Sequence, residues 1–181
     1  MDREKDVESA SSRYTGVYDW IGVAIVSLAA VALIFSFAFR IFGVDGDSMN
    51  PTLHTGERLI VSRLPYVPQR GDIVIAALPG QAALVKRVIG LPGERVTIDD
   101  ETGEVAVDDE VLDEPYIQGT TFSKGLSERI VPEGCVFVMG DNRENSTDSR
   151  SARIGFIPVE DLAGKVIYRF YPLNKMGRVT Q

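Results

Sequence analysis

A run of twenty residues without a charged side chain, at positions 20–39, constrains this chain more than any other feature. As a helix, twenty residues at about 1.5 Å each extend about 30 Å, which is the thickness of the hydrocarbon core of a bilayer. Trp20 at one end and Arg40 just beyond the other are residue types that anchor a span at the membrane surface. We therefore predict one N-terminal transmembrane helix over residues 20–39 that tethers the protein to a lipid bilayer.

Two other interpretations of this run fit less well. A helix buried in a soluble core normally keeps a polar stripe, which the run lacks. The small residues Ser36 and Ala38 resemble the end of a cleaved signal peptide. However, the apolar stretch is longer than the roughly 7–15 residues of a signal-peptide core, and a long polar segment precedes it. We therefore expect an uncleaved anchor.

The basic residues around the run give its expected orientation. Arg3, Lys5 and Arg13 precede it, whereas Arg40 and then Arg58 are the first basic residues that follow. Cytoplasmic flanks of membrane helices carry an excess of basic residues. We therefore expect a polar cytoplasmic tail at residues 1–19 and an extracytoplasmic domain at residues 40–181. A single-pass protein of this size in the plasma membrane is typical of bacteria.

The residues after the run have the pattern of a mainly β domain. Short runs rich in β-branched residues are separated by turns that contain Pro and Gly. They lie at 58–62, 72–76, 83–89, 95–98, 104–107, 135–139 and 165–170. Regular spacing without intervening helices predicts a β-barrel or sandwich-like domain. The formal net charge of −7 argues against nucleic acid as a partner.

An acidic stretch at residues 99–114 predicts a hairpin lobe that protrudes into solvent, within a hairpin-rich part of the domain at about 95–130. A calcium loop would need regularly spaced oxygen ligands, and these acids lack that spacing. One cysteine, Cys135, and one histidine, His54, are too few for a zinc site of His and Cys ligands. We expect no metal and no organic cofactor.

Three segments carry residues suited to chemistry. The first is a loop, Asp45-Gly-Asp-Ser48-Met-Asn-Pro-Thr-Leu53, which follows the membrane run. The second is Lys86, within an apolar β run. The third is a polar loop, Gly140-Asp-Asn-Arg-Glu-Asn-Ser-Thr-Asp-Ser-Arg150, which follows the run at 135–139. A serine needs a base within hydrogen-bond reach, and a lysine can serve if burial lowers its pKa, as in documented buried lysines with pKa of about 5–6. Composition and spacing alone leave other interpretations open, because an isolated serine such as Ser48 is more often a turn residue and Lys86 could lie on the solvent face of its strand.

Together and in this order, the three segments resemble the type I signal peptidase family of membrane-anchored Ser/Lys endopeptidases. The resemblance extends from the anchor to about Tyr171. Self-cleaving repressor-type Ser/Lys proteases share the chemistry, but they are soluble and carry a DNA-binding domain in place of an anchor. The resemblance implies a serine endopeptidase that removes signal peptides from exported precursor proteins at the membrane surface. The alternative is a catalytically silent, membrane-anchored β module that binds exported polypeptides.

The resemblance also implies roles for single residues. Ser48 would be the nucleophile and Lys86 the general base, with Ser146 orienting the Lys86 amine. The Ser48 N–H would bind the oxyanion, but some members have a hydroxyl residue where this chain has Gly46, which leaves the second donor open.

Other residues would support the site or bind substrate. The supporting residues on the polar loop would be the pair Asp148 and Arg150, together with Asp141 and Arg143. Substrate would bind along Ala83, Leu84 and Val85, beside Met49, for which a packing role is an equal alternative.

Overall fold

The computed structural model describes residues 2–125 and 127–179, and it divides the chain into an N-terminal helical unit and a β domain that begins at Phe39. The helical unit is α1 (Asp2–Ala38), which extends through most of the predicted tail. An 18-residue window within its segment Tyr18–Ala38 has a mean hydropathy of 2.6, and the segment is long and apolar enough to cross a membrane. The helix ends one residue before the predicted boundary, because Phe39 pairs with Ser62 in the first strand.

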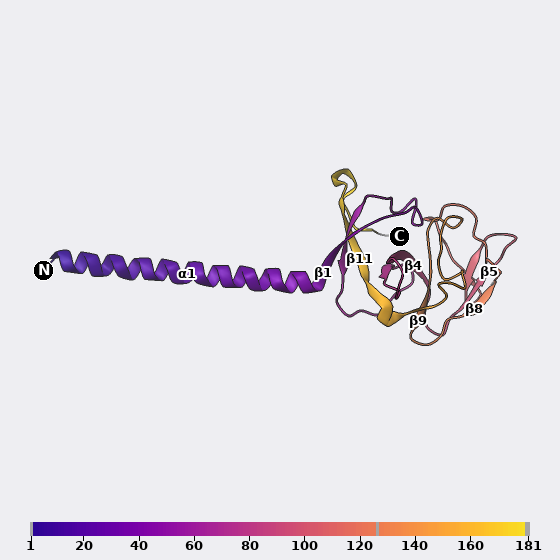
Figure 1. The fold of residues 1–181 in the computed structure, drawn as a ribbon, viewed down its shortest axis with the longest axis horizontal. Helices are drawn as coiled ribbons and strands as arrows, with labels where there is room; N and C mark the ends of the chain where they lie inside the picture. The colour runs from indigo at the N-terminus through magenta and orange to yellow at the C-terminus, as the bar shows by residue number, and fades with distance from the viewer. Residues whose placement is uncertain (1, 126, 180–181) are drawn as a thin grey trace. The chain divides into compact units, whose positions relative to one another are not determined.

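The β domain contains two antiparallel sheets (Figure 1). In spatial order, the larger sheet consists of β1 (Phe39–Gly43), β2 (Arg58–Ser62), β11 (Leu162–Tyr171), β3 (Ile73–Ala76), β4 (Leu84–Gly90), β9 (Cys135–Met139) and β10 (Ile157–Pro158). The smaller sheet consists of β7 (Glu110–Val111), β6 (Val105–Val107), β5 (Arg95–Ile98) and β8 (Glu128–Ile130). Two short 3₁₀ helices, η1 (Val159–Asp161) and η2 (Leu173–Lys175), flank β11. The larger sheet is curled, so the prediction of a mainly β, barrel-like domain is confirmed.

The smaller sheet contains the predicted hairpin. Strands β5 and β6 pair with Ile98 opposite Val105, and the turn between them closes with a hydrogen bond from the Gly103 N–H to the Asp99 carbonyl at 2.8 Å. Gly103 has a φ of 77°, a conformation that glycine adopts without strain. Figure 1 shows β5 and β8 at the side of the domain away from β11.

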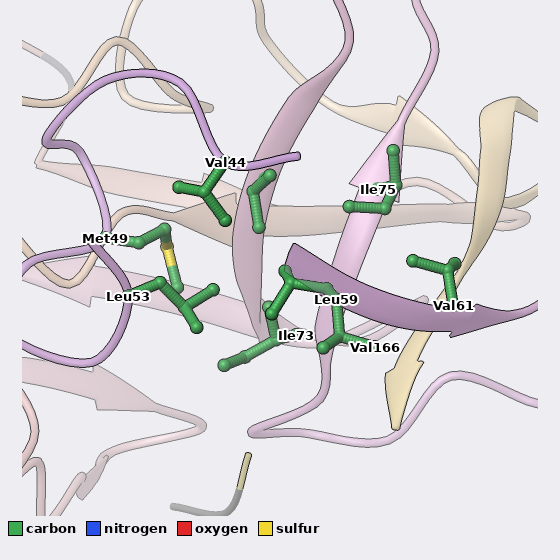
Figure 2. Packing of buried hydrophobic residues seen from close by; sticks show 9 residues of the cluster. Val44, Met49, Leu53, Leu59, Val61, Ile73, Ile75 and Val166 are labelled. Carbon is green, nitrogen blue, oxygen red and sulfur yellow. The ribbon is translucent and has the colours of Figure 1, made fainter. Parts of the chain in front are cut away.

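A cluster of buried apolar side chains lies under the larger sheet and fixes the loop between β1 and β2. Its members from β2, β3 and β11 face Val44, Met49 and Leu53 of that loop (Figure 2). Met49 and Leu53 are 1% and 0% exposed. Burial of large aliphatic side chains stabilises a fold by about 1.5–3 kcal/mol each. The loop that carries Ser48 is therefore held by the core on both sides of the serine.

Candidate active site

Ser48 and Lys86 meet although 38 positions separate them in the chain. Ser48 is half-buried in the loop between β1 and β2, next to the buried Met49. Lys86 lies on β4, opposite Val74 of the neighbouring strand β3. The Lys86 Nζ donates to the Ser48 Oγ at 2.7 Å and to the Val85 carbonyl at 2.9 Å. This is hydrogen-bond contact between a hydroxyl and an amine, as a nucleophile and its base require.

Burial changes the ionisation of Lys86. Its side chain belongs to a strand that is buried from Val85 to Gly90, and the residue is 2% exposed. Desolvation by this burial lowers the pKa of Lys86 from 10.5 to about 8, against the opposing effect of the Asp148 and Asp141 carboxylates. The Arg150 guanidinium lowers it further. At mildly alkaline pH, much of Lys86 is therefore a neutral amine that can accept a proton.

A cavity of about 270 Å³ opens beside this pair. Its lining includes Ser48, Met49 and Lys86 together with Phe42 and residues 82–85. Ala83, Leu84 and Val85 therefore lie at the cavity, and Met49 both lines it and packs in the core.

One edge of β4 is open beside this cavity. The pairing of β4 with β9 begins at Arg87, opposite Met139, so among the described residues no strand covers Ala83 to Val85 on that side. The Val88 N–H and carbonyl bond toward the β3 side, to Asp72 and Gly71. Because the direction alternates along a strand, the backbone polar groups of Val85 point to the open side, and the Val85 carbonyl also accepts the hydrogen bond from the Lys86 Nζ. An extended peptide can pair there.

The loop 140–150 surrounds the pair with buried ions. Asp148 and Arg150 are both fully buried and are joined by two hydrogen bonds of 2.8 Å. Although burial alone raises the pKa of Asp148, the Arg150 hydrogen bonds and charge hold it below its usual range. The Gly140 N–H also donates to Asp148, at 3.0 Å. The Asp148 carboxylate is thus ionised and held in one orientation.

Ser146 lies next to these groups, but its hydroxyl is not bonded to Lys86. The Ser146 Oγ is buried and has no hydrogen-bond partner in the described part of the chain. It is near the Asp148 carboxylate and contributes to the lowering of its pKa, although the geometry is short of a hydrogen bond. The backbone of Gly140 lies against both Ser146 and Ser48, because a Cβ added at Gly140 would be 2.3 Å from the Ser146 Oγ and 2.4 Å from the Ser48 carbonyl oxygen.

The Gly46 amide does not point freely into the site. Gly46 has a φ of 101°, which favours glycine, and its N–H donates to the Thr55 Oγ1 at 3.0 Å. The Asp47 carbonyl accepts hydrogen bonds from the Asn50 N–H at 3.2 Å and from the Asn142 Nδ2 at 3.1 Å. The peptide unit that carries the Ser48 N–H is therefore fixed from both sides.

Several residues that contact the site have no assigned role in the sequence analysis. Arg87, next to Lys86 on β4, binds Asp141 through its Nε at 2.9 Å and its Nη2 at 2.6 Å. The Arg87 guanidinium lies 3.8 Å from the centre of the Tyr116 ring. Thr52 donates to the same Asp141 carboxylate. The sequence does offer a sign of this role, because Arg87 is a charged residue within the apolar run 83–89. A guanidinium buried there needs a counter-ion.

Glu114 is an exception to the prediction that the acidic stretch 99–114 protrudes into solvent. Its side chain is only 6% exposed and forms an ion pair with Arg143, whose side chain is 0% exposed. The other acids of the lobe include exposed residues such as Asp109, which is 76% exposed in its pair with Arg95. The composition of the stretch gives no sign of which acid turns inward, because the partner lies 29 positions away.

Within residues 2–125 and 127–179, no group of three or more His, Cys, Asp and Glu side chains could hold a metal ion. The chemistry that the described residues offer is that of a serine hydroxyl, a buried amine and buried ion pairs.

Comparisons with known proteins find relatives over most of the chain. Residues 17–171 match the family described as signal peptidase, peptidase S26. The chain is 36% identical over 186 residues to signal peptidase I of Bacillus licheniformis, covering 94% of this chain and 97% of the relative. It is 35% identical over 181 residues to signal peptidase I S of Bacillus subtilis, covering 92% and 96%, respectively. It is 38% identical over 172 residues to a probable signal peptidase I-1 of Synechocystis, covering 85% of each chain.

A solved structure is also similar to the chain. The crystal structure of a signal peptidase I from Enterococcus faecalis V583 has 33% sequence identity and a TM-score of 0.43, and it covers 55% of this chain and 97% of that chain. The match over residues 17–171 and the relatives of the same length establish the conclusion. The chain belongs to the signal peptidase I family, peptidase family S26.

Proposed function

We propose that the protein is a serine endopeptidase that cleaves N-terminal signal peptides from exported precursor proteins, with Ser48 as nucleophile and Lys86 as general base. The observation that carries the proposal is the 2.7 Å hydrogen bond between the Ser48 Oγ and a Lys86 amine that is 2% exposed. The signal peptidases among the relatives support the substrate class.

The reaction follows from this pair. The neutral Lys86 amine accepts the Ser48 proton, and the Ser48 Oγ attacks the carbonyl carbon of the scissile peptide bond. The protonated Lys86 then gives its proton to the leaving amine, and the N-terminal peptide remains as an ester of Ser48. Lys86 next takes a proton from a water molecule whose oxygen attacks the ester carbonyl carbon, and it gives that proton to the Ser48 Oγ as the bond between Ser48 and the peptide breaks. The Ser48 N–H, whose peptide unit is fixed at the Asp47 carbonyl, stabilises the oxyanion in both halves.

Ser146 is proposed to orient the Lys86 amine after acylation. At that stage the Ser48 Oγ is bound to the substrate and no longer holds the amine. The Ser146 hydroxyl is buried, has no hydrogen-bond partner among the described residues, and lies at Gly140 together with the Ser48 carbonyl. The buried pair Asp148 and Arg150 and the Asp141 carboxylate support the loop that carries it.

The open edge of β4 is proposed to bind the substrate. A peptide paired with Ala83 to Val85 sends alternate side chains to the same face, so residues one and three positions before the cut both point into the enzyme. The cavity of about 270 Å³ beside Met49 accepts small side chains at these positions. We expect alanine at both positions and a permissive position between them.

The decisive test is cleavage of a synthetic precursor by the purified protein, with the cut mapped by mass spectrometry. Ser48→Ala and Lys86→Ala should each abolish cleavage, and the double variant should be no worse than either, because the two residues act as one unit. Phenylalanine in place of alanine immediately before the cut should slow cleavage. Full activity of Lys86→Ala would refute the mechanism. Equal cleavage of the phenylalanine peptide would refute the substrate pocket.

A further inference from the structure

A segment of the hairpin lobe lies along the loop 140–150. This segment, residues 114–124, lies between β7 and β8 in the chain, and we refer to it as the brace. The Gln118 N–H donates to the Asp141 carbonyl and the Arg143 N–H donates to the Gln118 carbonyl, both at 2.8 Å. Further bonds join Lys124 Nζ to the Ser146 carbonyl at 2.6 Å, Arg150 Nη1 to the Phe122 carbonyl at 3.3 Å, and the Thr120 N–H to Glu144 Oε1 at 3.1 Å. The brace is therefore bonded to the loop along most of its length.

Glu114 makes the buried ionic contact at the start of the brace. Its Oε2 accepts a hydrogen bond from the Arg143 Nη1 at 2.8 Å, and its Oε1 accepts another from the Nη2. The Tyr116 hydroxyl donates to the Oε1 at 2.9 Å, and Thr121 also binds the Nη1, at 2.8 Å. The Arg143 Nε also donates to the Gly140 carbonyl, at 3.2 Å. A guanidinium that is 0% exposed is costly without a counter-charge, and among these partners the Glu114 carboxylate supplies that charge.

Arg143 directly follows Asn142, the residue of the loop 140–150 that binds the loop of Ser48. The neighbouring residue, Asn142, donates its N–H to the Ser48 carbonyl at 3.0 Å and its Nδ2 to the Asp47 carbonyl at 3.1 Å. The Asp47 carbonyl and the Ser48 N–H belong to one planar peptide unit. The position of Asn142 therefore sets the direction of the Ser48 N–H.

We propose that Glu114 is a positioning residue of the active site: through Arg143 it holds Asn142 where Asn142 orients the oxyanion-binding N–H of Ser48. This inference rests on the Ser48 and Lys86 chemistry proposed above. Glu114 does not touch the reacting atoms, so its loss misplaces a donor that acts mainly in the transition state. The groups whose charges shift the pKa of Lys86 are Asp148, Asp141 and Arg150, and Glu114 is not one of them.

The test compares Glu114→Gln, which keeps the shape but removes the charge, with Glu114→Asp and a matched control. The control is Asp109→Asn, which breaks an exposed ion pair in the same lobe. With full-length protein in detergent, below the melting temperature of every variant, we expect Glu114→Gln to lose about tenfold in kcat with little change in KM, because a transition-state interaction is lost. The pH midpoint should not move, Glu114→Asp should recover part of the rate, and Asp109→Asn should match the wild type.

Three results would overturn the proposal: a kcat of Glu114→Gln equal to that of Asp109→Asn, a loss confined to KM, or a shifted pH midpoint. If Glu114→Gln does not fold, Tyr116→Phe takes its place. That change removes only the hydroxyl that binds Glu114 and leaves the ring beside Arg87. It should lower kcat by a smaller factor without changing KM, and a wild-type kcat would overturn the proposal.

Hydrogen exchange separates this inference from the proposed function. In the Ser48→Ala background, which cannot turn over, amides of residues 140–150 should exchange faster with Glu114→Gln than with Asp109→Asn. Faster exchange supports the positioning role even if the wild type fails to cleave precursors, in which case only the proposed function fails. Equal exchange in the two variants overturns the positioning role even if the wild type is active.

Discussion

At the scale of single residues, the pKa of Lys86, the proposed base, depends on its place in a buried β-strand. The lysine lies in the interior of the larger sheet, where β3 covers one side of its strand. Water that would stabilise an ammonium is excluded, and the nearby Asp148 and Asp141 recover only part of that stabilisation, so the pKa falls to about 8. The Asp148 and Asp141 carboxylates thus keep the pKa of Lys86 from falling further, and they would preserve its basicity if it acts as the proposed base.

The pH dependence of cleavage follows from this ionisation. We expect kcat/KM to rise about tenfold per pH unit below pH 8 and to level off above it, because only the neutral amine accepts the serine proton. Initial rates on a synthetic precursor from pH 6 to pH 10 measure the midpoint. A rate that is flat across this range would contradict the assignment of Lys86 as the base.

The same ionisation predicts an effect on stability. The folded-state pKa of Lys86 is below the unfolded value of 10.5, so the unfolded chain binds more protons between about pH 8 and 10.5, and stability rises with pH in that window. Relative to Lys86→Met, the wild type should gain up to about 1.4 kcal/mol in free energy of unfolding per pH unit there. Urea unfolding in detergent at pH 7 and pH 9.5 measures the difference.

The control for this measurement is Val67→Thr, which changes an 83% exposed side chain and no titratable group. Its difference from the wild type should stay nearly constant between the two pH values. If the Lys86→Met difference is also constant, Lys86 is charged equally in both states and is too well solvated to be the base.

At the scale of elements, the end of β9 and the loop after it bring the site together. Gly140 follows the last residue of β9, and its backbone lies in contact with both Ser146 and the Ser48 carbonyl. Such an approach leaves no room for a side chain. The short distance between β9 and the loop of Ser48 therefore requires a glycine at position 140 because only glycine is small enough. The backbone angle does not require it, because Gly140 is not among the glycines with positive φ.

Gly140→Ala tests this close approach. The added Cβ would be 2.3 Å from the Ser146 Oγ and 2.4 Å from the Ser48 carbonyl oxygen, so the loop must move. We expect a loss of stability of about 1–3 kcal/mol, typical of overpacking, and a larger loss of cleavage because the nucleophile is displaced. Gly177→Ala is the matched control, since a Cβ there meets nothing within 4 Å. Unfolding curves and cleavage rates that are the same for both variants would show that the loop yields without cost.

The strands that are rich in β-branched residues were predictable from sequence, and the short or irregular ones were not. The runs at 58–62, 95–98 and 135–139 coincide with β2, β5 and β9. Strand β1 was missed because its apolar residues continue the membrane run, with no turn residue to mark the change from helix to strand. Strand β10 is two residues long and contains Pro158, which usually argues against a strand.

The sequence also predicted which residues meet at the site better than it predicted their contacts. Ser48, Lys86, Asp141, Asp148 and Arg150 all lie in one region. The Arg87 pair with Asp141 and the Glu114 pair with Arg143 join residues 54 and 29 positions apart, respectively. Long-range pairing of this kind depends on how the sheets curl, which local pattern does not encode.

At the scale of the whole molecule, the helix and the β domain are joined without a linker. The helix α1 ends at Ala38, and β1 begins at Phe39. Ten residues separate the end of the helix from Ser48, and a chain of that length spans at most about 36 Å. Chain length alone therefore keeps Ser48 within about 36 Å of the end of Tyr18–Ala38, the segment that we propose crosses the bilayer.

The proposed orientation can be tested in sealed cells. A protease-sensitive tag before residue 1 should be protected from external protease, and a tag after residue 181 should be cut, because the basic residues before the span favour a cytoplasmic N-terminus. Permeabilised cells, in which both tags are cut, are the control. Cutting of the N-terminal tag alone in sealed cells would place the β domain in the cytoplasm and contradict the proposed role in export.

The open edge of β4 has a consequence for the behaviour of the free protein. An unpaired strand edge invites pairing with another chain and hence self-association. Here the edge is open only from Ala83 to Val85, because β9 pairs with the strand from Arg87 onward. A foreign strand can therefore gain very few ladder bonds, too few to hold two copies together. In the proposed function, this short edge limits contact with a substrate to a few residues, and the same shortness limits self-association of the β domain through β4.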